Sequence, residues 1–198
     1  MRKKVCVFGV VFFIAAICFF PFVLSRQDTS SAQNYSLEEA LRVLQAIERV
    51  EAESSQPWNG PLREIAVTEG ELNSYIAYRI ETESEEIMKE LRLKIFDKNR
   101  IEGKIGIDLR GQKIPQFIRP DLNFYFSADV LVSNGLVKID VKEVFLEDEP
   151  INLQLLDMII AISARLSGEE PTSINNWYEL PYGINDIKTQ KGKAIFLY

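Results

Sequence analysis

The chain has 198 residues, contains no histidine and carries a net charge of −6. The lack of histidine excludes catalytic triads and metal sites built on imidazole, and the negative charge opposes binding to the phosphates of nucleic acids. Both cysteines, Cys6 and Cys18, lie in an apolar N-terminal run, so the rest of the chain has no disulfide. The length suits one domain with a short preceding segment.

Residues 1–25 predict a signal anchor. Three basic residues at positions 2–4 precede an uncharged run of 20 residues from Val5 to Leu24, which is long enough to cross a membrane as a helix. The positive charge predicts a cytoplasmic N-terminus, with the bulk of the chain extracytoplasmic, either periplasmic or at the cell surface. Cleavage after Ser25 is the alternative and would release a secreted domain. Without these 25 residues, which hold three basic groups and no acid, the chain carries a charge of −9.

Residues 26–61 are predicted to form a tether with one amphipathic helix. The first ten are polar and aperiodic, as in a flexible linker. Ser36 and Glu39 then form a capping box, and apolar residues follow at helical spacing as far as about Ala52. The helix from Ser36 to Ala52 either packs on the following domain or binds a partner protein.

The main domain is predicted to cover residues 62–198. It begins with a short extended segment at Ile65, after which Thr68 and Glu71 form a second capping box. The helix that follows has an apolar face that includes Leu72 and Ile76.

From Leu91 the apolar residues recur at every second position. Residues 91–95 and 101–109 alternate in this way around the turn at residues 97–100, which predicts an antiparallel hairpin with one solvated face. A longer strand follows, with one apolar face formed by Leu122, Phe124, Phe126, Ala128, Val130 and Val132.

Asn134-Gly135 predicts a two-residue type I′ turn between this strand and the next. Counting back from the turn places Val132 opposite Val137 and Val130 opposite Ile139. An uninterrupted ladder would place Phe126 opposite Glu143, whereas one extra residue near positions 142–143 keeps the apolar residues paired. The sequence therefore predicts a β-bulge at this point.

Between Ile151 and Leu166 lie nine large aliphatic residues, whereas Gln154, Asp157 and Arg165 share one narrow polar stripe. This pattern predicts a helix that is buried on most sides and begins after the acids at 147–149, with Pro150 in its first turn. The predicted fold is α+β: a twisted antiparallel β-sheet wrapped around one long apolar helix, preceded by an N-terminal transmembrane helix.

Residues 184–189 and 193–198 flank a Gln-Lys-Gly turn and predict a last hairpin that fixes the C-terminus in a sheet. The aromatic loop from Trp177 to Tyr182 precedes it and either covers the mouth of a groove or packs on the sheet. The sequence contains no phosphate loop, nucleophile elbow or zinc spacing. We therefore expect no enzymatic activity, no cofactor and no metal site.

The order of these parts, together with the stretch from Val67 to Ile76 that contains Thr68-Glu69-x-Glu71-Leu72-Asn73, is similar to a known group of proteins. From Ile65 to Tyr198 the chain resembles small bacterial envelope proteins with a lipid-binding, TULIP-like fold, some of them membrane-anchored or lipoproteins. The helix from Ser36 to Ala52 departs from that pattern. The resemblance implies binding of a lipid or other apolar molecule between sheet and helix, and no catalytic residues.

The predicted function is therefore that of a membrane-tethered extracytoplasmic domain that binds a lipid or other hydrophobic ligand without catalysis. The residues predicted to line the ligand groove are Ile105, Ile107, Phe124, Phe126, Val130, Ile139, Leu155, Ile159 and Ile162. The alternative for these residues is a dry core that binds nothing. The alternative function is a membrane-anchored scaffold or assembly factor that acts through protein contacts.

Overall fold

The computed structural model describes residues 35–57, 59–82, 88–110, 119–154, 156–157 and 173–198. Strands take 45% and helices 27% of the described residues, so the domain is mainly β. Its elements are α2 (Leu37–Ser54), β1 (Glu64–Thr68), α3 (Glu69–Thr82), β2 (Met88–Ile95), β3 (Arg100–Asp108), β4 (Asp121–Ser133), β5 (Leu136–Leu146), β6 (Glu149–Pro150), β7 (Tyr178–Glu179), β8 (Asp186–Gln190) and β9 (Lys193–Leu197).

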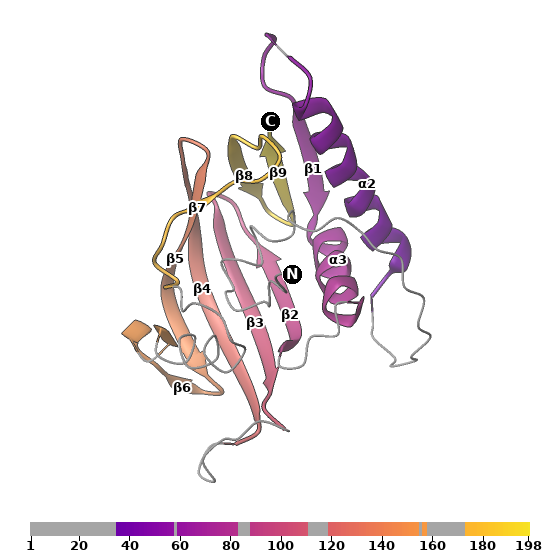
Figure 1. Cartoon of the computed structure of the whole chain (residues 1–198). Helices are drawn as coiled ribbons and strands as arrows, with labels where there is room; N and C mark the ends of the chain where they lie inside the picture. The colour runs from indigo at the N-terminus through magenta and orange to yellow at the C-terminus, as the bar shows by residue number, and fades with distance from the viewer. Residues whose placement is uncertain (1–34, 58, 83–87, 111–118, 155, 158–172) are drawn as a thin grey trace, which may run out of the picture.

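The larger of two antiparallel sheets runs in the order β2-β3-β4-β5-β6, with β7 also paired to β5, and curves into a half-barrel (Figure 1). Its strands alternate between buried aliphatic or aromatic residues and exposed polar ones, which confirms the predicted hairpin of β2 and β3. Gly103 lies opposite Phe126 on the apolar face, so the aromatic ring covers the position where a side chain is missing.

The register of β4 and β5 confirms the prediction made from the Asn134-Gly135 turn. Val132 pairs with Val137 and Val130 with Ile139. The register then shifts by one residue, because Ala128 pairs with Val141 and Ser127 with Glu143, which leaves Lys142 as the extra residue of a β-bulge. The bulge keeps Phe126 and Val144 on the buried face.

The smaller sheet has the order β1-β9-β8 and joins segments from the two ends of the described chain (Figure 1). β9 lies in the middle, paired with β8 through the predicted last hairpin and with β1 from Glu64 to Thr68. Arg63 and Tyr198 extend the pairing by two backbone hydrogen bonds of 2.8 and 3.0 Å, so the C-terminus is held in the sheet as predicted.

Both predicted capping boxes begin helices. At α3, the Thr68 hydroxyl accepts from the Glu71 N–H and the Glu71 carboxylate accepts from the Thr68 N–H. At α2, the Ser36 hydroxyl accepts from the Glu39 N–H, whereas the Glu39 carboxylate accepts from Ser74 Oγ of α3 at 2.7 Å. α2 packs on α3 with its apolar face and lies alongside β1 (Figure 1).

The prediction of a sheet wrapped around one long apolar helix is wrong. The helices among the described residues are mainly α2 and α3, which are short and pack at the side of the sheets (Figure 1). The acids at 147–149 do not begin a helix. Glu147, at φ 53°, and Asp148 instead form a tight turn, after which Glu149 and Pro150 pair with β5.

The physical reason is that the chain continues the sheet instead of leaving it. The Ile151 N–H donates to the Val144 carbonyl at 3.0 Å, so the chain stays bonded to β5 beyond Pro150. Helical geometry is described only at residues 153–154 and 156–157. Most of the predicted helix, with Leu155, Ile159 and Ile162, lies outside the described residues.

Within the described ranges, neither α2 nor α3 is long and apolar enough to cross a membrane. The predicted anchor from Val5 to Leu24 lies outside those ranges.

Candidate functional site

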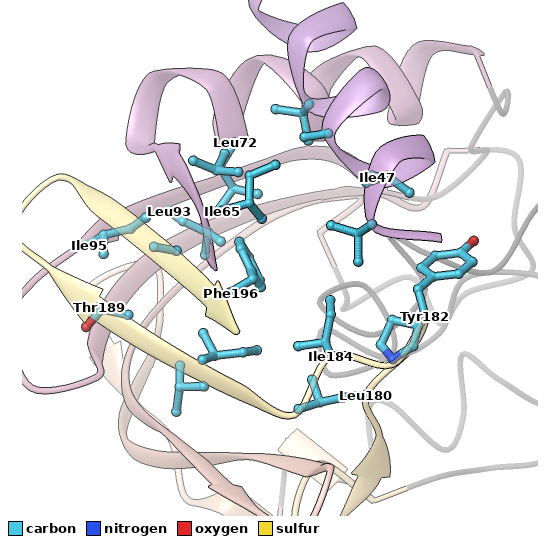
Figure 2. A pocket seen from close by; sticks show the side chains of 18 of the residues that line it. Ile47, Ile65, Leu72, Leu93, Ile95, Leu180, Tyr182, Ile184, Thr189 and Phe196 are labelled. Carbon is cyan, nitrogen blue, oxygen red and sulfur yellow. The ribbon is translucent and has the colours of Figure 1, made fainter. Parts of the chain in front are cut away.

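An apolar cavity of about 90 Å³ lies between α2, the smaller sheet and one end of the larger sheet (Figure 2). Ile47 and Tyr182 stand at one end of it, and Ile95 and Thr189 at the other (Figure 2). Its wall consists of Val43, Ala46, Ile47 and Val50 of α2, Ile65 and Val67 of β1, Leu72 of α3, Leu93, Ile95, Ile101 and Val130 of the larger sheet, the segment Leu180, Pro181, Tyr182 and Ile184, and Ile187, Thr189, Ala194 and Phe196 of β8 and β9.

The local sequence explains why these side chains meet. Val43, Ile47 and Val50 follow at spacings of four and three residues, which places them on one face of α2. On β1, Ile65 and Val67 are two residues apart and therefore share a face of the strand. The cavity forms where the helix face lies over this strand face.

The wall offers no free buried hydrogen-bonding group. Thr189 is its main buried polar residue, and its hydroxyl donates to the Phe96 carbonyl. Across the described part of the chain, every buried side-chain nitrogen or oxygen has a partner. A water molecule in a protein interior needs two to four polar partners, so this space favours an apolar group over water.

Tyr182 stands at the cavity in an unusual backbone conformation. Tyr182 and Gly183 have φ of 52° and 73°, and the Ile184 N–H donates to the Pro181 carbonyl at 3.0 Å, which closes a tight turn. A bulky residue with positive φ is rare, and such strain is found preferentially at ligand sites. The turn contacts the end of α2, because a side chain on Gly183 would meet Ser54 Cβ at 3.0 Å.

A more polar groove runs on the other side of the α2–β1 contact. It shares four wall residues with the cavity, namely Val43, Ala46, Ile65 and Val67. Arg42, Gln45, Arg49 and Glu71 also line it. The cavity and the groove are therefore adjacent, and side chains of α2 and β1 line both of them.

The two arginines of this groove differ in their ion pairs. Arg42 Nε lies 3.1 Å from Glu71 Oε1, and its Nη1 lies 3.3 Å from Glu38. Hydrogen bonds from the backbone and hydroxyl of Thr68, with Arg42 as a further cause, lower the pKa of Glu71 although partial burial opposes this. Arg49 is exposed and forms no ion pair with any described residue. It acts electrostatically on Tyr198, whose pKa is raised by burial and by Glu53.

The predicted lining residues that belong to β3, β4 and β5 share one face of the larger sheet, but most of them do not line this cavity. Ile105, Phe124, Phe126 and Ile139 are buried, and Ile107 is half-buried. Of all the predicted lining residues within the described ranges, only Val130 lines the cavity.

Residues of α2, β1 and β9 were missing from the predicted site. The helical spacing of Val43, Ile47 and Val50 is a visible signal of a buried face, but it does not reveal which element covers that face. The two ends of the aromatic loop differ in their surroundings. Tyr182 lines the cavity, whereas Trp177 is 44% exposed.

Asp157, which was predicted to lie on a polar stripe, is half-buried and has hydrogen-bond partners within the protein. Its carboxylate accepts from Ser173 Oγ and from the Ile174 N–H, both at 3.1 Å, and so ties two chain segments together. No group of three or more acidic or cysteine side chains suited to a metal ion occurs in the ranges that the structure describes.

Comparison with known proteins finds no matching family model, no matching curated protein and no matching solved structure. These comparisons therefore neither support nor oppose the resemblance to TULIP-like envelope proteins.

Proposed function

We propose that the protein is a membrane-tethered extracytoplasmic domain that binds an apolar ligand, without catalysis, in the cavity between α2 and the smaller sheet. The observation that carries the proposal is a cavity wall made almost entirely of aliphatic and aromatic side chains, with its polar atoms satisfied from within the protein. The tether is proposed from the apolar run between Val5 and Leu24.

The volume limits what enters the cavity in this conformation. A dry apolar cavity of about 150 Å³ is large enough to bind benzene. At about 90 Å³, this cavity suits the end of an alkyl chain and not a whole lipid. Each buried methylene contributes about 0.8 kcal/mol, so an inserted chain end adds to the affinity without supplying all of it.

The proposed site is the cavity beside α2, whereas the sequence predicted a groove between the larger sheet and a central helix. The proposed ligand is of the same class as the one that the TULIP-like resemblance implies. An empty cavity produced by imperfect packing is the competing explanation, and the experiment must separate the two.

A photoreactive fatty acid with a diazirine at its chain end tests the proposal on the full-length protein in lipid nanodiscs. Covalent adducts are mapped by mass spectrometry after illumination. We expect adducts on peptides that contain Val50 or Ile184, and competition by unmodified palmitate. Adducts confined to other surfaces, or none that palmitate displaces, would contradict ligand binding here.

Filling the cavity supplies the matched comparison. Ala194 is buried in its wall, so Ala194→Leu occupies the space and should remove the adducts while the melting temperature stays equal or rises. Ala52→Leu adds the same atoms at an exposed position of α2 and should leave the adducts unchanged. Equal labelling of both variants would support the explanation by imperfect packing.

The second candidate is a membrane-anchored scaffold that acts through protein contacts. It is favoured by Leu37 and Leu41, which lie one turn apart on α2 and are 53% and 42% exposed. Changing both to Gln should abolish partner capture by a scaffold but leave the labelling of the cavity unchanged.

A further inference from the structure

The groove beside the cavity bears on the chemical class of the ligand, provided that the proposed binding function holds. Among the described residues, the cavity wall has no charged side chain, and its buried hydroxyl, on Thr189, is already bonded to the Phe96 carbonyl. The charged end of an amphiphile must therefore lie outside the cavity. Val43, Ala46, Ile65 and Val67 line both the outer groove and the cavity, so the two are adjacent. Ala46 has the smallest of these side chains and therefore obstructs the space between them least.

Charge distinguishes this groove within an acidic protein. The whole chain has a net charge of −6, yet the groove contains Arg42, Arg49 and one acid, Glu71. Because Arg42 is paired with Glu71 and Glu38, Arg49 is the cation whose guanidinium has no carboxylate partner in the described structure. A guanidinium binds a carboxylate through two parallel hydrogen bonds.

We propose that the ligand is a single-chain amphiphile with one negative charge, of the fatty carboxylate class. Its carboxylate pairs with Arg49 in the groove, and its chain passes beside Ala46 into the cavity. A head with two negative charges fits less well, because Glu71 lies in the same groove and Glu53 stands one turn beyond Arg49.

Competition against the photoreactive fatty acid tests this inference on the full-length protein in nanodiscs. The competitors are palmitate and hexadecanol, which have the same chain length and differ in the charge of the head. The measurement is made at about pH 9, where a carboxyl group is ionised and arginine remains charged. We expect palmitate to compete about 3-fold better than hexadecanol, as for one ion pair to an exposed arginine.

Arg49→Gln should remove this difference by weakening palmitate about 3-fold while leaving hexadecanol unchanged. Arg49→Lys keeps the positive charge but cannot form the bidentate hydrogen bonds of arginine, so it should retain part of the preference for palmitate. Arg110→Gln, at an exposed arginine two residues beyond the end of β3, serves as the control and should change neither competitor. Arg49 is exposed and makes no ion pair with another described residue, so the melting temperature of Arg49→Gln should equal that of the wild type.

The outcomes separate this inference from the proposed function. If hexadecanol and palmitate compete equally in the wild type, or if Arg49→Gln leaves the palmitate preference intact, the headgroup assignment is overturned and apolar binding stands. If neither competitor displaces the probe, the proposed function fails and the inference fails with it.

Discussion

Asn73 and Leu93 are joined by a pair of hydrogen bonds that imitates the pairing of two strands. Asn73 Nδ2 donates to the Leu93 carbonyl and the Leu93 N–H donates to Asn73 Oδ1, both at 2.8 Å. One turn earlier, the Glu69 carboxylate accepts from the Ile95 N–H at 2.7 Å. Side chains of α3 thus occupy the edge of β2, which would otherwise present unpaired backbone groups to another chain.

Asn73→Ala should destabilise the domain and expose this edge. Removing the amide leaves the N–H and carbonyl of Leu93 without partners, which costs about 1–3 kcal/mol. Urea unfolding followed by circular dichroism gives the free-energy change, and light scattering reports self-association through the freed edge. Asn175→Ala changes an exposed asparagine and should alter neither measurement. A fully stable, monomeric Asn73→Ala protein would show that the edge needs no such cover.

Two glycine substitutions should have opposite effects. A Cβ on Gly103 would lie 2.4 Å from the Phe126 ring, so Gly103→Ala must displace that ring and should cost about 1–3 kcal/mol. Gly70 lies in the first turn of α3, where a Cβ would only touch the Glu39 carboxylate at 3.6 Å. Gly70→Ala should therefore add up to about 1 kcal/mol of stability. Thermal melts of the two variants and the wild type show whether each substitution lowers or raises the stability.

Ser74 and Glu39 should be energetically coupled across the α2–α3 contact. Ser74 is 5% exposed, donates to Glu39 Oε2 at 2.7 Å and accepts from the Ser36 N–H at 3.3 Å. Ser74→Ala leaves both groups without a partner, at a cost of about 1–3 kcal/mol. A double-mutant cycle with Glu39→Gln should give a coupling of at least about 0.5 kcal/mol. Strictly additive effects would contradict the coupling.

Glu71 should make stability depend on pH in the acid range. Its pKa in the folded protein is lowered below the ordinary value of 4.5, chiefly by the hydrogen bond from the Thr68 backbone. A lowered pKa means that the carboxylate stabilises the fold above the unfolded pKa, and that this contribution is lost as pH falls through the folded pKa. Glu71→Gln keeps the shape of the capping box and should cost about 0.5 kcal/mol at pH 7.

The measurement is urea unfolding of Glu71→Gln and wild type between neutral and acid pH. The difference should shrink toward zero as the pH falls below 4.5 and the glutamate gains its proton. Asn175→Ala, at an exposed residue that carries no charge, serves as the control and should match the wild type at both neutral and acid pH. A difference that persists unchanged in acid would assign the effect to geometry and not to charge.

Much of the sheet was predictable because the determining information is local. Alternating apolar residues fix which face of each strand is buried, and the Asn134-Gly135 turn fixes the register from which the bulge at Lys142 follows by counting. The two capping boxes begin α2 and α3 for the same reason, since each signal lies within four residues.

The predictions that failed concern which segments, distant in the sequence, pair with each other. The acids at 147–149 and Pro150 suit the start of a helix, but hydrogen bonds to β5 continue the sheet there instead. The pairing of β1 with β9, which closes the cavity, joins segments from opposite ends of the domain, and no local pattern specifies it.

The sequence alone therefore determined the sheet faces, the Asn134-Gly135 turn, the bulge and the starts of α2 and α3, each through contacts between near neighbours. Only the tertiary structure decided that α2 covers the smaller sheet, and that Arg49 lies in a groove beside the cavity wall. An amphipathic helix specifies that one face must be buried, but the partner is chosen by the packing of the whole domain.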